Sequence, residues 1–335
     1  MRDYLRRSAA LSLCVLFFSI SLAACGSSGS PGGTASFSST APPSAVAPQA
    51  TPTPTPAPTP VPTPVRDNTP VVLENTAPGS VTYGNSVVTI DASNTADGYF
   101  MARYEGSNQK VKLVLDGPDG RQYRFDMNNA WQAFPLAAGS GSYTLGVYEN
   151  VYDTSYTQAY SVSFDAAVKD EFTTFLRPNE YVNYTADSAA VQKGAELADG
   201  AQSDLEVVGR VYDFVIEHLT YDYDKADNVK SGYLPNVDNI MATGTGICFD
   251  YASLMATMLR SQRIPTRLDI GWSGDIYHAW ISVYLAESGW VNGIIQFDGT
   301  QWKRMDPTFA DNGDQEDWIM EYIQKDSNYN TLLVY

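Results

Sequence analysis

Cysteine is scarce in this chain, with three residues among 335, and histidine is scarcer still, with two. The cysteines are Cys14, Cys25 and Cys248. Cys14 and Cys25 belong to the first 25 residues, so Cys248 is the single thiol of the remaining chain, which excludes a disulfide within it. A single remaining cysteine suggests a thiol kept for its reactivity.

Positive charge is also in short supply. The 21 lysines and arginines stand against 38 aspartates and glutamates, which gives a formal net charge of -17 at pH 7. Such an excess of negative charge argues against binding to nucleic acid and against adsorption to anionic lipid head groups.

The N-terminal apolar run, Ala9–Ile20, is short for a transmembrane span, although a plain membrane anchor is the alternative interpretation. Three arginines precede it, and Leu22-Ala23-Ala24-Cys25 follows it. This order predicts a secretory signal peptide over residues 1–24. The ending resembles a bacterial lipobox, which implies a lipidated Cys25 and an extracytoplasmic protein held at the bacterial cell membrane by its lipid.

Two segments of different character follow. Residues 25–69 are dominated by Pro, Thr, Ser, Gly and Ala and predict an extended, disordered linker. Residues 70–167 contain short alternating apolar runs separated by Gly- and Pro-rich turns, which predict an antiparallel β-sandwich, immunoglobulin-like in type. The expected strands are Val87–Asp91, Tyr99–Tyr104, Val111–Asp116, Gln122–Phe125, Tyr143–Tyr148 and Tyr160–Phe164. The tyrosines of this region are either half-buried strand residues or a strip that binds glycan or peptide.

Residues 168–335 change to a helical pattern. Ser203 and Glu206 have the spacing of a capping box at the start of one helix. A second helix is predicted from Cys248 towards Arg263, because apolar residues recur three and four positions apart. Cys248 then lies in the first turn, where unpaired backbone N–H groups and the helix dipole favour a thiolate. The alternative is an ordinary buried cysteine.

Two strands are expected downstream of this helix. One begins at His278, and a shorter one ends near Asp306, ahead of Pro307. A cysteine nucleophile needs a base to accept its proton and a third group to orient that base. Cys248, His278 and Asp306 supply these roles in chain order.

The blocks Gly246-Ile247-Cys248-Phe249-Asp250-Tyr251-Ala252, His278-Ala279-Trp280 and Asp306-Pro307-Thr308 together resemble the transglutaminase-like superfamily, particularly its bacterial branch. The resemblance covers about the C-terminal half of the chain. It implies an α+β fold with a papain-like core, in which the nucleophile lies on a helix and the histidine and aspartate lie on strands.

An oxyanion formed at this site needs two hydrogen-bond donors, one of which is expected to be the backbone N–H of Cys248. Tyr221, Tyr223 and Tyr233 are candidates for the other, and the sequence does not choose among them. Asp250 is interpreted as a helix-start carboxylate that accepts backbone N–H groups, with no catalytic role. The loops Gly232–Asp238 and Trp272–Tyr277 are expected to shape the entrance.

No cofactor is expected, and no metal. The acidic residues at positions 222–238 lack the spacing of an EF-hand loop, and the three blocks contain no close-spaced pair of zinc ligands.

The sequence therefore predicts a cell-surface lipoprotein that carries out thiol acyl transfer on amide bonds of protein or cell-wall peptide. The alternatives are a cysteine peptidase or amidase of the same fold, and a non-catalytic binding or scaffold module.

Overall fold

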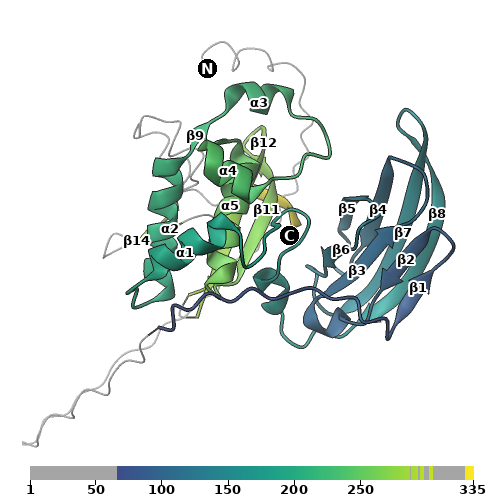
Figure 1. Ribbon diagram of the computed structural model, residues 1–335, viewed down its shortest axis with the longest axis horizontal. Helices are drawn as coiled ribbons and strands as arrows, with labels where there is room; N and C mark the ends of the chain where they lie inside the picture. The colour runs from purple at the N-terminus through teal and green to yellow at the C-terminus, as the bar shows by residue number, and fades with distance from the viewer. Residues whose placement is uncertain (1–65, 287, 293–294, 298–301, 305–328) are drawn as a thin grey trace, which may run out of the picture. The chain divides into compact units, whose positions relative to one another are not determined.

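The computed structural model of the protein describes residues 66–286, 288–292, 295–297, 302–304 and 329–335 (Figure 1). The predicted signal peptide (1–24), the predicted lipidation site Cys25 and most of the predicted linker (25–69) lie outside these residues. Within the described ranges, no helix combines the length and the apolar character that crossing a membrane requires.

Residues 82–166 form two antiparallel sheets, with strand orders β1-β2-β3-β6 and β5-β4-β7-β8. The strands are β1 Thr82–Gly84, β2 Val88–Asp91, β3 Tyr99–Tyr104, β4 Val111–Asp116, β5 Gln122–Met127, β6 Gln132–Pro135, β7 Gly141–Tyr152 and β8 Ser155–Ala166. A short 3₁₀ helix, η1 (Thr95–Asp97), lies between β2 and β3.

Alternation decides which face of each strand is buried. In β4, Val111, Leu113 and Leu115 are buried and the residues between them are not, as a strand packed on one face requires. The expected strands coincide with β2, β3, β4, β5, β7 and β8, so the antiparallel sandwich is confirmed. The sequence did not reveal β1 and β6, which have only three and four residues. The strand order differs from the ABED and CFG sheets of immunoglobulin constant domains, so the immunoglobulin-like order is not found.

The C-terminal part is organised around α5, which carries Cys248 at its first position and is buried from residue 250 to residue 261. Helices α1, α2 and α4 pack against it (Figure 1). The helices are α1 Ala189–Ala198, α2 Asp204–His218, α3 Tyr223–Asn228, α4 Val237–Thr243 and α5 Cys248–Ser261. The predicted cap of α2 is confirmed, because the Glu206 N–H donates to Ser203 Oγ over 3.1 Å.

A four-stranded sheet with the order β13-β12-β11-β16 lies against α5 through β11 and β12. Its strands are β11 Thr266–Ser273, β12 Ile276–Leu285, β13 Gly289–Asn292 and β16 Tyr329–Val334. The remaining short elements are η2 Thr173–Leu176, the pair β9 Thr220–Tyr221 and β10 Thr245–Gly246, and the pair β14 Ile295–Phe297 and β15 Trp302–Arg304. The predicted α+β class is thus confirmed.

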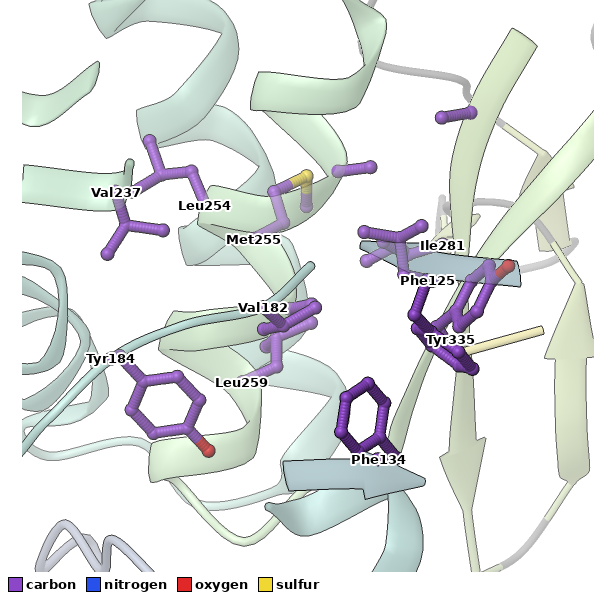
Figure 2. Packing of buried hydrophobic residues seen from close by; sticks show 14 of the residues in the cluster. Phe125, Phe134, Val182, Tyr184, Val237, Leu254, Met255, Leu259, Ile281 and Tyr335 are labelled. Carbon is purple, nitrogen blue, oxygen red and sulfur yellow. The ribbon is translucent and has the colours of Figure 1, made fainter. Parts of the chain in front are cut away.

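Aromatic side chains join the sandwich to the C-terminal part. The Phe125 ring of β5 lies 5.8 Å from the Tyr181 ring and 5.5 Å from the Tyr335 ring, centroid to centroid. Figure 2 shows Phe125, Phe134 and Tyr335 gathered beside Leu259 of α5. Each large side chain removed from water contributes about 1.5–3 kcal/mol. The two parts therefore share one hydrophobic core.

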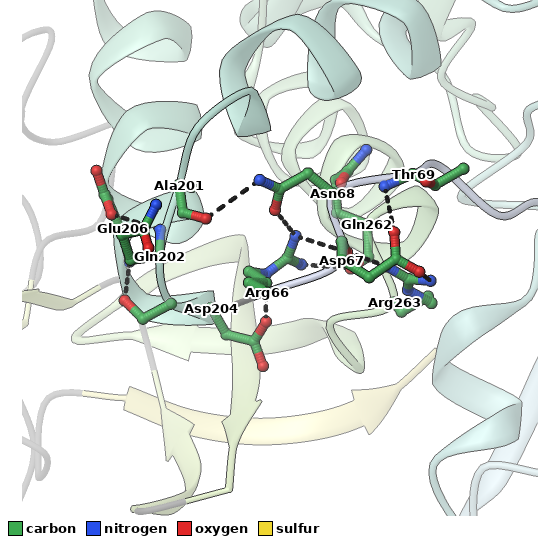
Figure 3. A network of polar contacts seen from close by, with 11 residues as sticks. Arg66, Asp67, Asn68, Thr69, Ala201, Gln202, Asp204, Glu206, Gln262 and Arg263 are labelled. Atoms are coloured by element: carbon green, nitrogen blue, oxygen red, sulfur yellow. Dashed lines mark hydrogen bonds and ion pairs between the residues drawn. The ribbon is translucent and has the colours of Figure 1, made fainter. Parts of the chain in front are cut away.

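A short strap, residues 66–69, crosses the C-terminal part before the chain enters the sandwich (Figure 3). Arg66 donates from Nε to Asp204 Oδ1 over 2.7 Å and from Nη2 to the Gln262 carbonyl over 2.6 Å. Arg263 hydrogen-bonds the Asp67 carboxylate, and this bond holds the pKa of Asp67 well below its usual range. The predicted linker extended to Thr69, but these side chains bind the core from residue 66 onwards.

Arg260 near the end of α5 is fully buried, and no described Asp or Glu side chain lies within ion-pair distance of it. Its guanidinium donates to three backbone carbonyls, those of Thr266 at 2.9 Å, Arg177 at 2.6 Å and Tyr335 at 2.8 Å. Burial lowers the pKa of Arg260 to about 10, so the group stays charged at neutral pH. One cation thus ties together three segments that are distant in the sequence.

Replacing this cation tests its role. Arg260→Met should lower the free energy of unfolding by about 3 kcal/mol, because three buried carbonyls lose their donor. Arg263→Met is the matched control, since Arg263 makes an exposed ion pair with Asp67 that is worth less than about 1 kcal/mol. Urea denaturation of both variants measures the difference. Equal losses would contradict the structural role of Arg260.

Glu180 is a second buried charge, 9% exposed, on the segment that contacts the sandwich. Neither of its carboxylate oxygens has a hydrogen-bond partner within the described part of the chain. Burial, reinforced by the nearby Asp126 carboxylate, raises the pKa of Glu180 from 4.5 to about 8. Between these two pH values the unfolded chain binds fewer protons than the folded chain, so stability falls as pH rises.

Glu180→Gln removes this titration. The variant should be more stable than the parent protein at pH 8, by an amount on the order of a few kcal/mol, and close to it at pH 5. Thermal unfolding at the two pH values measures the effect. A difference from the parent that is the same at pH 5 and pH 8 would show that Glu180 does not titrate in this range.

Candidate functional site

Cys248 is the first residue of α5 and is partly exposed to solvent. The preceding residues, Thr245 and Gly246, pair in parallel with Thr220 and Tyr221, which fixes the approach of the chain to the helix. The first N–H groups of a helix have no partner within it and point outwards along the axis. The predicted position of the thiol in the first turn of a helix is confirmed.

Asp250 holds this first turn in place. Its carboxylate is completely buried and accepts the Ile247 N–H at Oδ2 over 2.8 Å. The side chain folds back over Gly246, where an added Cβ would lie 2.6 Å from the Asp250 Cβ. Glycine at 246 and aspartate at 250 therefore belong to one local structure. The predicted role of Asp250 as a helix-start carboxylate is confirmed.

Asp250 also reaches beyond its own helix. Lys225 of α3 donates to Oδ2 over 2.5 Å, and the Tyr233 hydroxyl donates to Oδ1 over 2.6 Å. Lys225 Nζ also contacts the Tyr233 hydroxyl at 2.7 Å. Burial, together with the Asp250 hydrogen bond, raises the pKa of Tyr233 far above its usual value. Tyr233 is thus a neutral donor whose hydroxyl is already engaged.

His278 lies near the start of β12 and is 5% exposed. It pairs across the ladder with Gly271 of β11, and its ring stacks on Trp280 with centroids 6.3 Å apart. The strand begins two residues before the histidine, at Ile276. Residues 272–277, predicted to be a loop, are mostly strand ends of a hairpin, because Trp272 pairs with Tyr277 and Ser273 with Ile276.

Cys248 and His278 line one groove with a volume of about 1220 Å³. Tyr221 and residues 229–234 also line this groove. The outer faces of β4 and β5 of the sandwich form another part of the lining. The groove therefore collects residues from helix, sheet and sandwich around one thiol and one imidazole.

Tyr277, the last residue of a stretch predicted to shape the entrance, lines the groove. Its side chain is 56% exposed, and its ring packs edge-on against Trp272 at 5.4 Å. Burial of the hydroxyl, followed by the nearby Cys248 sulfur, raises the pKa of Tyr277. Its nearness to Cys248 depends on how α5 packs against β12, a long-range contact that the sequence does not indicate.

The three tyrosines named as oxyanion donors occupy different places. Tyr221 and Tyr233 line the groove with Cys248, whereas Tyr223, 57% exposed, does not line it. Asp306, predicted to orient His278, lies outside the described residues. His218 interacts with the Met241 carbonyl at 2.9 Å and is also absent from the groove lining. In the part of the chain that the structure describes, no three Cys, His, Asp or Glu side chains are grouped as a metal would require.

Residues 191–293, about a third of the chain, match the family described as the Transglutaminase-like superfamily. No curated protein matches the sequence at a significant level. The matched stretch contains both Cys248 and His278 and ends ahead of Asp306.

Three solved structures are similar to the chain. A candidate cysteine protease from Cytophaga hutchinsonii is 12% identical, with 71% of this chain and 75% of that chain covered and a TM-score of 0.36. The periplasmic domain of TgpA from Pseudomonas aeruginosa is 15% identical, with 72% and 99% covered and a TM-score of 0.33. The red sea bream transglutaminase is 15% identical, with 68% and 53% covered and a TM-score of 0.27. Of these comparisons, it is the family match that relates residues 191–293 to transglutaminase-like domains.

Proposed function

We propose that the protein is a cysteine-dependent acyltransferase that acts on amide bonds of protein or peptide substrates. The observation that carries this proposal is that Cys248, at the start of a buried helix, and His278, at the start of a strand, line the same groove. A thiol in a helix first turn and a nearby imidazole are the two groups that nucleophilic acyl transfer requires.

In the proposed reaction, His278 accepts the thiol proton and the Cys248 sulfur attacks the amide carbonyl carbon. The carbon–nitrogen bond of the amide then breaks, and His278 returns the proton to the departing amine or ammonia. This leaves a thioester on Cys248. An acceptor amine attacks the thioester, loses a proton to His278, and releases the new amide and the free thiol. Asp306 remains the predicted group that orients the imidazole.

Water in place of the acceptor amine would make the protein a cysteine peptidase or amidase. Transfer requires an amine to be held at the thioester more effectively than water. The exposed rings of Tyr277 and Trp272 beside the groove support transfer, because they form an apolar edge along which an alkyl amine can pack.

Amine incorporation tests the proposal. The parent protein should attach a labelled primary amine to a glutamine-containing protein, and Cys248→Ala and His278→Ala should lower the rate at least about 100-fold. His218→Ala is the matched control, since this histidine lies outside the groove lining and should keep the rate near that of the parent. Incorporation that survives Cys248→Ala would refute the proposal. Deamidation or backbone cleavage without amine uptake would assign the protein as a hydrolase.

We further propose that Cys25 is lipidated and holds the protein at the outer face of the bacterial cytoplasmic membrane, where cell-wall peptide is one available substrate. The Leu22-Ala23-Ala24-Cys25 sequence supports this. In a bacterial host fed an alkyne-tagged fatty acid, the protein should acquire the tag, and Cys25→Ser should abolish it. Cys248→Ser is the control and should be tagged like the parent. Equal tagging of the Cys25→Ser variant would exclude lipidation at this site.

A further inference from the structure

The sandwich forms one wall of the groove through the outward-facing residues of β4, β5 and β7. Lys112 pairs across the ladders with Asp126 on one side and Tyr148 on the other, so the three side chains form a row on this face. The next row contains Val114, which pairs with Arg124. All five of these residues line the groove that contains Cys248.

A loop of the C-terminal part, residues 229–234, approaches this sandwich wall and also lines the groove. Gly232 has a φ of +85°, and a Cβ at this position would lie 2.8 Å from Asp126 Oδ2. Glycine is therefore required both by the backbone conformation and by the close approach to the carboxylate. The loop brings Lys230 into the groove lining.

The charges on this lining are opposite in sign to those of the whole chain. Among the described residues that line the groove, the basic side chains are Lys112, Arg124 and Lys230, and Asp126 is the one acidic side chain. Asp126 is already paired with Lys112 over 2.6 Å. The chain as a whole has a formal net charge of -17. The lining beside the thiol therefore carries an excess of positively charged side chains, in contrast to the chain as a whole.

Arg124 and Lys230 carry this excess. Within the described ranges neither has a carboxylate within ion-pair distance, whereas Arg66, Arg103, Arg121, Arg210 and Arg263 all do. The Arg124 guanidinium donates from Nε and Nη2 to the neutral amide oxygen of Gln122, at 3.0 and 2.7 Å. Because Gln122 is uncharged, it does not neutralise the guanidinium. The remaining N–H groups of Arg124 are available to bind a carboxylate in a bidentate manner.

We propose that the groove selects acyl donors that carry carboxylate side chains close to the reacting amide, with Arg124 and Lys230 as the specificity-determining residues. This inference rests on the proposed acyl transfer at Cys248 and adds the substrate class, an acidic peptide. The sandwich is then part of the substrate site. Tyr148 and the hairpin residue Tyr156, which also line the groove, provide apolar surface for the peptide between its charges.

Binding to an inactive variant tests the substrate class independently of turnover. Two fluorescein-labelled peptides of roughly ten residues share a central glutamine, and one carries aspartates where the other carries asparagines. In fluorescence anisotropy with Cys248→Ala, the acidic peptide should bind about tenfold more tightly than the neutral one. Adding Arg124→Gln or Lys230→Gln should remove most of this preference and leave the weak binding of the neutral peptide unchanged.

Arg121→Gln is the matched control, because it removes one positive charge just ahead of β5 at a residue outside the groove lining. It should keep the preference for the acidic peptide. Equal binding of both peptides, or a preference that persists without Arg124 and Lys230, would overturn the inference even if amine incorporation succeeds. The two proposals can also fail separately. If the Arg124→Gln and Lys230→Gln variants lose the preference for the acidic peptide, but the protein shows no Cys248-dependent amine incorporation, the ligand class is upheld and the acyl transfer is refuted.

Discussion

The buried carboxylate of Asp250 is the constraint on which the candidate site depends. Removing an ionised group from water is costly unless its oxygens are fully hydrogen-bonded, and Asp250 meets this requirement with donors from Ile247, Lys225 and Tyr233. These donors lie on the start of α5, on α3 and on the groove loop. One carboxylate therefore fixes the turn that presents Cys248 and also the edge of the groove beside it, and loss of any donor would leave a buried charge incompletely satisfied.

The groove is lined by two kinds of structure, the packed core of the C-terminal part and one face of the sandwich. Helix α5 and strand β12 belong to one packed core and provide the thiol and the imidazole at fixed positions. The sandwich face provides side chains that can vary without disturbing that core, because the buried residues of β4 and β5 alternate with the groove residues. The aromatic contacts between Phe125, Tyr181 and Tyr335 hold the sandwich against the C-terminal part. In the proposed function, reactivity and selectivity therefore depend on different parts of the structure.

The elements around Cys248 were predictable from the sequence because their signals are local. Apolar spacing gave α5, the Ser203 box gave the start of α2, and alternation gave most of the sandwich strands. The groove was not predictable, since it depends on contacts between residues far apart in the chain. Lys112 and Arg124 alternate with apolar residues, as in any strand with one face exposed to solvent. The sequence around them does not indicate that they line the same groove as a thiol. The Lys225 partner of Asp250, 25 residues away, was hidden for the same reason.

The strap gives the molecule a particular response to mechanical load. The chain upstream of Arg66 leaves from the C-terminal part, and Arg66 and Asp67 attach beside the end of α5, at Gln262 and Arg263. Cys248 is at the other end of this 14-residue helix, about 20 Å away. A pull on the upstream chain would therefore meet the contacts of Arg66 and Asp67 at the end of α5 before it reached the sandwich or the groove.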